Sequence, residues 1–331
     1  EYLEEDPFVV VGSFVPQLGG NARLGSSESA YLVAEVDEYR YHFLDFSATY
    51  TILTTLDYDH PDVFTSEASY RNAFHRYLDQ FSSEGVLVAN RDNPGVTQLL
   101  QERPETDQFR IITYGEHEDA DVQLKEDAYI YVQGERVATL TLSLSGEHNR
   151  SNATGVFALL WHLGFSPERI TSAIEPFRGL ARRQELKGRM NTGATLIDDY
   201  AHHPAEIRAV YNALREEYPD HRLWIIFQPH TYTRTEALKD DIANALGDFD
   251  VVWLRPVYGS AREKEGNVSA DDIRELILAN SPHHDESTVK DIVSERAMEA
   301  TLRTETGHND ILVTMGAGNI HKLGEHLIEP N

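Results

Sequence analysis

Hydrophobic residues in the first half of the chain form short runs separated by longer segments with helical spacing. Four runs rich in β-branched and aromatic residues predict strands, at 31–35, 50–56, 86–90 and 109–115. Two segments have apolar residues at helical intervals, 66–81 and 153–163. Another helix is predicted after Ser166, because serine followed by proline is a typical N-cap and first turn. Alternating segments over 119–146 predict an antiparallel hairpin with its turn at Gly134.

The second half follows a more regular pattern. Compact apolar runs predict strands at 194–197, 223–227, 250–254 and 310–315. Helical segments separate these strands, among them 212–218, 236–246 and 270–280. One helix is predicted to begin at about Pro204, and Ser269 with Asp272 is a capping signature for the helix at 270–280. Strands that alternate with helices predict an α/β fold, in which a parallel sheet has helices on both faces.

Length and composition limit the class of protein. A chain of 331 residues is long enough for two domains, and we place their boundary near residue 182. No apolar run approaches the roughly 18 residues of a membrane span, and the first residues lack the features of a signal peptide. The chain has no cysteine, which excludes disulfides and thiolate metal sites. We therefore expect a cytoplasmic protein without membrane insertion.

The charge balance is strongly acidic. The sequence has 55 Asp and Glu residues against 29 Lys and Arg residues, a formal net charge of −26. Such a surface repels nucleic acid and anionic membranes, so neither is expected as a partner. An acidic, lysine-poor surface is also typical of proteins adapted to high salt, and that alternative stays open. Because the net negative charge repels an anionic substrate, arginines near the binding site must hold such a substrate.

Polar clusters follow two predicted strands of the first half. Glu35 ends a run with the apolar character of a buried strand, and Asp57, Asp59 and His60 follow the next run. Carboxylate and imidazole ligands suit Mg²⁺ or Mn²⁺. Each cluster alone is also typical of a solvated turn.

Polar residues also precede the helix predicted near residue 153. His148, Asn149 and Asn152 lie at its start. Asparagine amides can read an adenine edge as both donor and acceptor. Simple N-capping by asparagine is the alternative.

Two clusters follow strands of the second half. His230 and Arg234 come after the strand at 223–227, ahead of a helix start that favours anions. An arginine there suits a carboxylate or phosphate, although a surface role is the alternative. The glycines of GAGN, beginning with Gly316, permit close backbone approach, but the pattern is not GxGxxG.

The stretch DDYAHHPAEI, residues 198–207, lies between a predicted strand and the helix at Pro204. Open α/β sheets bind their ligands at such strand ends. Its two carboxylates and two imidazoles are compatible with a metal site, a nucleotide-binding turn or a polar helix start. The adjacent His202 and His203 project their rings in different directions, which disfavours joint binding of one metal ion.

Taken in order, these clusters resemble the motifs of the Mur ligases. The motifs are EVDEYRYHF, TTLDYDHP, GEHNRSN, FRGLARRQELKG, DDYAHHPAEI, FQPHTYTRT, VYGSARE and GAGNI, and the resemblance runs from about Val10 to Ile328. DDYAHHP is similar to the family member that recycles murein peptides. FQPHTYTRT followed by VYGSARE is most similar to the member that adds L-alanine.

The resemblance implies an architecture and a reaction. The architecture is a central nucleotide-binding α/β domain, 1–182, incomplete at its N-terminus, followed by a Rossmann-like α/β C-terminal domain, 183–331. The reaction joins L-alanine to the carboxylate of UDP-N-acetylmuramate in peptidoglycan precursor synthesis. ATP, with Mg²⁺ or Mn²⁺, phosphorylates that carboxylate, and the amine of L-alanine attacks the acyl phosphate. Such phosphoryl transfer depends mainly on positioning and charge neutralisation.

The resemblance also implies roles for individual residues. The catalytic set is Glu35, His60, Arg183 and His203, and Glu35 and His60 in that set hold the metal ion. The nucleotide contacts are His148, Asn149 and Asn152 near the adenine, Arg183, and Asp199 near the ribose. The substrate contacts are His202, His230, Arg234 and Gly316. The stretch at 198–207 is therefore predicted to be a nucleotide and substrate turn and not a zinc site.

The sequence departs from the family pattern in several places. No GKT or GKS occurs in the 331 residues, so the glycine-rich phosphate loop of the family is missing, and we expect the chain alone to be an inactive fragment. Thr55 and Asn319 replace residues that the family commonly has as asparagine and aspartate, and Thr231 replaces an arginine of many members.

Three alternatives follow from these departures and motifs. One is a non-catalytic relative that keeps ligand-binding turns, and another is the murein tripeptide recycling ligase. The third is a metal-dependent hydrolase built on DDYAHHP and DYDHP.

Overall fold

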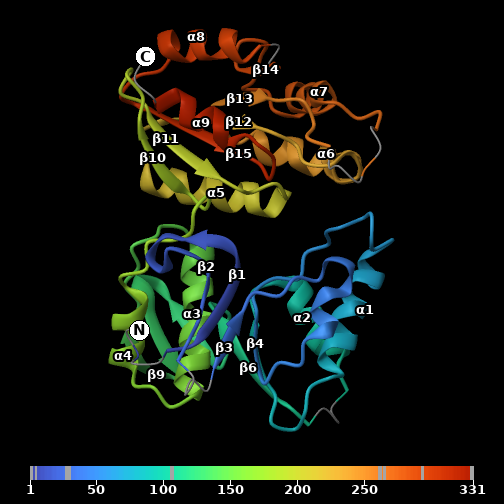
Figure 1. The fold of residues 1–331 in the computed structure, drawn as a ribbon, viewed down its shortest axis with the longest axis vertical. Coiled ribbons are helices and arrows are strands. Elements are labelled where there is room, and N and C mark those ends of the chain that lie inside the picture. The colour runs from blue at the N-terminus through green and yellow to red at the C-terminus, as the bar shows by residue number, and fades with distance from the viewer. Residues whose placement is uncertain are drawn as a thin grey trace. The chain divides into compact units, whose positions relative to one another are not determined.

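The computed structural model describes residues 3, 6–26, 31–104, 108–259, 263, 266–291 and 294–328. The chain divides into two compact units, Glu1–Arg178 and Gly179–Asn331 (Figure 1). Within the described part of the chain, no helix is both long and apolar enough to cross a membrane.

The first unit is built on a six-stranded sheet with the order β4-β5-β6-β7-β8-β9. The strands are β4 Tyr50–Leu53, β5 Val86–Asn90, β6 Arg110–Gly115, β7 Val122–Lys125, β8 Tyr129–Val132 and β9 Glu135–Thr139. Strands β4 to β7 run parallel, whereas β7, β8 and β9 form an antiparallel meander. The predicted hairpin turn at Gly134 is confirmed, because Val132 pairs with Glu135 around it.

Helices cover both faces of this sheet. They are α1 Glu67–Leu78, α2 Pro94–Glu102, α3 Glu147–His162 and α4 Pro167–Ile174, and short 3-10 helices span Pro16–Leu18, Tyr39–Asp45 and Glu126–Ala128. Alternate residues of β5 face opposite sides, so Leu87 packs in one core with α1 and α2. Val88 packs in a second core with Phe157 of α3 and Ile170 of α4.

A separate three-stranded sheet has the order β2-β1-β3. Its strands are β1 Phe8–Val15, β2 Gly20–Arg23 and β3 Leu32–Ala34. All three residues of β3 are exposed, so the prediction that Glu35 ends a buried strand is wrong. The strand is an edge strand that pairs only with β1 in the described residues, and its apolar sequence reflects β propensity and not burial.

The second unit contains a six-stranded sheet with the order β10-β11-β15-β12-β13-β14. Its strands are β10 Glu185–Arg189, β11 Thr195–Asp199, β12 Arg222–Phe227, β13 Val251–Leu254, β14 Val289–Asp291 and β15 Asp310–Met315. The edge strand β10 is antiparallel to β11, and the other neighbours run parallel. The predicted α/β class with a parallel sheet is confirmed.

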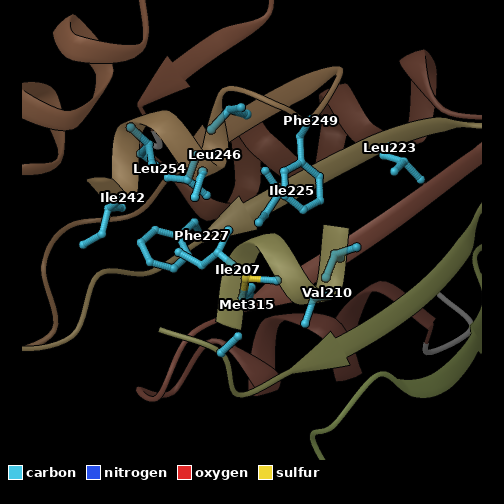
Figure 2. Packing of buried hydrophobic residues seen from close by; sticks show 14 of the residues in the cluster. Ile207, Val210, Leu223, Ile225, Phe227, Ile242, Leu246, Phe249, Leu254 and Met315 are labelled. Atoms are coloured by element: carbon cyan, nitrogen blue, oxygen red, sulfur yellow. The ribbon is translucent and has the colours of Figure 1, made fainter. Parts of the chain in front are cut away.

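Five helices of the described residues cover this sheet: α5 Pro204–Glu217, α6 Tyr232–Leu246, α7 Ala270–Asn280, α8 Glu295–Glu305 and α9 His321–Ile328. Ile225 and Phe227 of β12 pack with α5, α6 and α7 in one core (Figure 2). Trp224 and Ile226 face the opposite side and pack with α8 and α9. Alternate side chains of the buried strand β12 therefore contribute to the cores on both faces of the sheet.

Local signals explain where several elements begin. Helix α5 starts at Pro204 as predicted, with His203 as its N-cap, and Ser269 caps α7 with Asp272 in return. The predicted limits 86–90, 270–280 and 310–315 match the structure residue for residue. Helix α3 begins six residues before the predicted 153, because its first turn is polar and has no apolar spacing.

Candidate functional site

The carboxyl ends of three neighbouring strands bring polar residues together in the second unit. Asp198 and Asp199 end β11, Gly316 follows β15, and Gln228 follows β12. Since these strands lie side by side in the order β11-β15-β12, the residues share one edge of the sheet. This edge is the place where open α/β sheets bind ligands.

Asp199 is a buried carboxylate with two backbone donors. It is only 1% exposed. Its Oδ2 accepts from the amide of Gln184 at 2.8 Å and its Oδ1 from the amide of Ala201 at 2.7 Å. Burial raises the pKa of Asp199 to about 6, and these two hydrogen bonds and the nearby charge of Arg183 only partly oppose it.

Asp198 is equally buried and lies beside Arg182. Its Oδ1 accepts from Oγ1 of Thr314 at 2.6 Å, and its Oδ2 accepts from Nε of Arg182 at 3.2 Å. Burial raises the pKa of Asp198 in spite of both partners. Nη2 of Arg182 also donates to the carbonyl of Gly316 at 2.6 Å, so this arginine connects β11 to the glycine turn after β15.

Arg183, predicted to contact the nucleotide, is more exposed than Arg182. Its Nη1 lies 3.3 Å from Oε1 of Glu206, and its guanidinium lies 5.8 Å from the ring of Tyr200. Oε2 of Glu206 accepts from the amides of His202 and His203 at 3.0 and 3.2 Å. Burial opposes ionisation of Glu206, but the charges of His202 and Arg183 and these amides keep its pKa below the usual value.

The two adjacent histidines have different surroundings. The Nδ1 of His203 accepts from the amide of Ala205 at 3.3 Å, so this side chain caps α5. The Nδ1 of His202 lies 3.0 Å from the carbonyl oxygen of Tyr200, and its ring lies 6.0 Å from the ring of His230. The structure therefore brings together His202 and His230, which the sequence assigned to the substrate, and places His203 in a capping role.

His230 and Arg234 lie at the start of α6. Nη1 of Arg234 lies 3.4 Å from Nδ1 of His230, and the ring of His230 stacks on Tyr258 at 5.9 Å. Arg234 is 7% exposed. A buried arginine at a helix start, beside an imidazole, provides positive charge suited to a carboxylate or phosphate.

The carboxylate of Glu263 supplies the cap of α6. It accepts from the amides of Tyr232 and Thr233 at 2.8 and 2.7 Å. Burial opposes ionisation of Glu263, yet the hydrogen bonds from Thr233 and Tyr232 keep its pKa low. Ser260, Ala261 and Arg262 of the VYGSARE motif lie outside the described residues.

Gly316 occupies a position that only glycine fits. Its φ is 141°, and a Cβ there would lie 2.5 Å from the carbonyl oxygen of Gln228. Its amide donates to the carbonyl of Asp199 at 3.1 Å. The turn after β15 is thereby held against both β11 and β12.

In the first unit, His60 and Glu35 have separate partners. His60 adopts a left-handed backbone, with φ 57°, and its Nε2 lies 3.3 Å from Oε1 of Glu38. Glu38 also accepts from the hydroxyl of Tyr70 at 3.0 Å. Burial opposes ionisation of Glu38, but the hydrogen bond from His60 helps to keep its pKa below the usual value. Glu35 is exposed and accepts from the amide of Gly12 at 2.6 Å.

The predicted adenine contacts lie on the first turns of α3. His148 and Asn149 are half-buried and Asn152 is exposed. The N-cap is Gly146, and Nδ2 of Asn149 donates to the carbonyl of Ser145 at 2.7 Å. The alternative in which an asparagine caps this helix is therefore wrong.

Two family models match the chain. The Mur ligase middle domain matches residues 20–160, and the Mur ligase glutamate ligase domain matches residues 182–318. The chain belongs to the Mur ligase family. The family resemblance inferred from the motifs is thus confirmed, and the Mur ligases are ATP-dependent enzymes that form peptide bonds.

Individual relatives of this Mur ligase match nearly its whole length. It is 35% identical to the UDP-N-acetylmuramate–L-alanine ligase of Caldanaerobacter subterraneus, over 98% of this chain and 70% of the relative. The crystal structure of the UDP-N-acetylmuramate–alanine ligase MurC of Thermotoga maritima aligns with a TM-score of 0.75 at 25% identity, over 99% of this chain and 69% of that one. A murein peptide ligase of Psychrobacter arcticus shares the fold, with a TM-score of 0.69 at 20% identity, over 98% of this chain and 72% of that one.

Several polar residues of this Mur ligase were not singled out from its sequence. Glu38 and Glu263 lie inside quoted motifs, and Glu206 stands at the third helical position after His203, where a capping carboxylate is common. Arg182 also lies inside a quoted motif, FRGLARRQELKG, whereas Thr314 had no comparable signal. Their contacts join segments more than 100 residues apart.

Proposed function

We propose that this protein joins L-alanine to the carboxylate of UDP-N-acetylmuramate at the expense of ATP, in the cytoplasm. The observation that carries this proposal is the 35% identity, over 98% of the chain, to an enzyme named for this pair of substrates. The FQPHTYTRT and VYGSARE motifs, which distinguish this member from the peptide-recycling member, support the same choice.

The reaction begins with transfer of the γ-phosphoryl group of ATP to a carboxylate oxygen of the muramic acid, and ADP leaves as the bond between its β-phosphate and the γ-phosphorus breaks. The amine of L-alanine then attacks the acyl carbon, an amide forms, and inorganic phosphate leaves with the oxygen it gained. Both steps bring anions together, so the protein must supply positive charge and orientation. In a chain with a net charge of −26, that charge must be local.

Residues of the second unit are suited to these tasks. We assign Arg234 and His230 to the anionic acceptor substrate and the amino acid, since they combine burial with positive charge at a helix start. We assign Asp199 to the ribose hydroxyls, because an ionised carboxylate at a strand end is a good acceptor. Arg183 is assigned to the nucleotide, and His202 and Gly316 to the substrate. His203, predicted as catalytic, is assigned to holding the helix start that presents them.

In the first unit, we assign His148, Asn149 and Asn152 to the adenine and Glu35 and His60 to a divalent cation. Among the described residues no group of three or more His, Cys, Asp or Glu side chains is arranged for a metal ion. Mg²⁺ commonly takes only one or two protein carboxylates together with water and phosphate oxygens, and the exposed carboxylate of Glu35 meets that need, whereas His60 is assigned on the family resemblance alone. When bound, the cation neutralises phosphate oxygens.

The test is product formation with ATP, Mg²⁺, UDP-N-acetylmuramate and L-alanine, detected by mass spectrometry. Two forms are compared: the 331-residue chain, and the same chain joined behind an N-terminal segment that carries the phosphate loop of the family. We expect UDP-N-acetylmuramoyl-L-alanine from the second form and none from the first. Arg234→Gln in the active form is expected to lower kcat/KM by about 100-fold, the value of one buried charged contact.

The other outcomes separate the alternatives. A preference for a murein tripeptide over free L-alanine would establish the recycling reaction in place of this one. No product from either form, with nucleotide still bound, would favour a non-catalytic binding protein.

A further inference from the structure

Arg182 joins three segments that form the candidate site of the second unit. Its Nε donates to the buried carboxylate of Asp198, on β11, at 3.2 Å. Its Nη2 donates to the carbonyl of Gly316, in the turn after β15, at 2.6 Å. Its own carbonyl accepts from the amide of Tyr200, in the turn after β11, at 2.7 Å. One residue therefore ties the segment before β10 to both strand ends.

The backbone at this position is held in an uncommon conformation. Arg182 has φ 60° and Gln184 has φ 47°, both in the left-handed region that non-glycine residues rarely adopt. The amide of Arg182 donates to Oε2 of Glu185 at 2.9 Å, and the amide of Gln184 donates to Asp199 at 2.8 Å. Strain of this kind persists where surrounding contacts fix the chain, and it is common at functional sites.

The chemistry requires an arginine. Two acceptors in different segments are reached by two nitrogens of one planar guanidinium, and its face also lies 4.9 Å from the ring of Tyr200. A lysine ammonium keeps the charge but has no planar fork with which to span both acceptors. Arg183 next to it has a different role, because its side chain is 43% exposed and pairs with Glu206.

We propose that Arg182 is a positioning residue, which fixes the end of β11, and with it Asp199, in the arrangement that binds the nucleotide, and which holds the glycine turn at Gly316 beside it. This inference rests on the proposed function, since it assigns the nucleotide to that edge of the sheet. Arg182 acts through Asp198 and Gly316 and does not itself contact the reacting groups.

The experiment compares Arg182→Lys with Arg189→Gln, which removes an exposed arginine of β10 outside the site. Steady-state kinetics are measured on the form of the protein that is active in the ligase assay. We expect Arg182→Lys to raise KM for ATP by about tenfold, the value of one charge-assisted hydrogen bond, and to change kcat by less than about threefold. Arg189→Gln should change neither. A lower kcat with an unchanged KM would show a general structural role and overturn the proposal.

A second readout does not depend on turnover. Amide hydrogen exchange is followed in the segment 314–320, with the thermal midpoint as a check on folding. We expect faster exchange in Arg182→Lys than in the parent protein or Arg189→Gln, because the carbonyl of Gly316 loses its partner. Unchanged exchange together with an unchanged KM would reject the inference.

Direct nucleotide titration separates failure of this inference from failure of the proposed function. If the form that carries the phosphate loop binds ATP but forms no product, the proposed ligase reaction fails. The effect of Arg182→Lys on the dissociation constant then tests the positioning role by itself. If product forms and the variant binds ATP like the parent, only the positioning role fails.

Discussion

The two ends of the sheet in the second unit treat buried carboxylates in opposite ways. At the amino ends of the strands, Asp310 is 5% exposed and has a lowered pKa, although burial opposes its ionisation. At the carboxyl ends, Asp199 is 1% exposed and has a pKa raised to about 6. The residue type is the same, but Asp199 lies deeper in the protein, so the difference in pKa reflects burial as well as the donors that surround each carboxylate.

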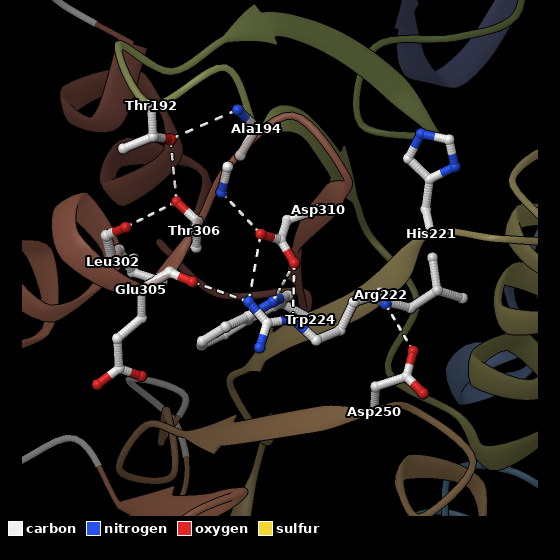
Figure 3. Close-up of polar contacts among 12 residues, drawn as sticks. Thr192, Ala194, His221, Arg222, Trp224, Asp250, Leu302, Glu305, Thr306 and Asp310 are labelled. Carbon is white, nitrogen blue, oxygen red and sulfur yellow. Dashed lines mark hydrogen bonds and ion pairs between the residues drawn. The ribbon is translucent and has the colours of Figure 1, made fainter.

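Asp310 is surrounded by donors (Figure 3). Arg222 contacts both oxygens, at 2.7 and 3.2 Å, and Trp224 donates through Nε1 at 2.9 Å. The amide of Gly307 donates at 2.7 Å. Asp199 has two backbone amides, at 2.8 and 2.7 Å. At the amino ends of the strands, the charge of Asp310 is therefore satisfied within the protein. At the carboxyl ends, Asp199 retains acceptor capacity for a ligand. This is the usual division between stability and function in α/β sheets.

The largest effect is expected from Asp310→Asn. The amide would place its NH₂ group against buried donors, and we expect a loss of about 2–4 kcal/mol in the free energy of unfolding. KM for ATP of the folded variant should not change, because the network lies at the opposite edge from the candidate site. Urea unfolding followed by tryptophan fluorescence gives the first quantity, and the ligase assay gives the second.

The matched control is Glu236→Gln, whose carboxylate pairs with Lys239 at 2.9 Å on the surface. This substitution should lower the free energy of unfolding by less than about 0.5 kcal/mol. If Asp310→Asn costs no more than this control, the amino edge does not have the stabilising role assigned to it.

An intermediate effect is expected from Gly316→Ala. The new Cβ would lie 2.5 Å from a backbone oxygen of Gln228 at a φ of 141°, so the turn must move, at a cost of about 1–3 kcal/mol. We expect kcat/KM for UDP-N-acetylmuramate to fall as well. Gly188→Ala is the control, because Gly188 has a similar φ of 139° and nothing within 4 Å of its added Cβ. Equal losses of activity in both variants would contradict a special role for the turn at Gly316.

The smallest effect concerns pH. Asp199 has a pKa of about 6 in the folded protein against an ordinary value of 3.8, so the native state holds this proton more tightly than the unfolded state does. Its contribution to stability is therefore present below the ordinary pKa, declines as the pH rises toward 6 and is level above it. Binding of ribose hydroxyls needs the ionised form, so kcat/KM for ATP should fall about tenfold per pH unit below that pKa.

A pH–rate profile of the parent protein and of Asp199→Asn tests this. The variant should lose the fall in kcat/KM below pH 6, and a carboxyl resonance of Asp199 in ¹³C NMR should titrate near the same pH. A parent profile that stays flat well below pH 6 would show that ionisation of Asp199 is not required.

Sequence patterns predicted the helices and strands of the second unit well. The strand at 310–315 is buried at every residue, so its apolar run gave unambiguous limits. The helix at Pro204 was found because proline and a capping histidine are local signals. Strand β1, by contrast, was not predicted, and the edge strand β3 was wrongly expected to be buried. Burial of a strand depends on which other segments pack over it, and the sequence of the strand itself does not show this.

The long-range polar contacts at both ends of these strands left no local trace in the sequence. Asp310 and Arg222 are 88 residues apart, and Arg182 and Gly316 are 134 residues apart. Propensity and spacing report only on neighbours along the chain, so such pairs cannot be found from one sequence. The site motifs were found because each lies on one short segment.

The position of β15 has a consequence for how the protein is made. It is the last strand in the described sequence, yet it lies between β11 and β12 at the centre of the sheet. During synthesis from the N-terminus, β11 and β12 leave the ribosome more than 80 residues ahead of β15, with nothing between them. Their facing edges stay open to pairing with other chains until the final strand arrives. Assembly of this unit is therefore a late event, and translation that stops before Asp310 leaves a polypeptide prone to aggregation.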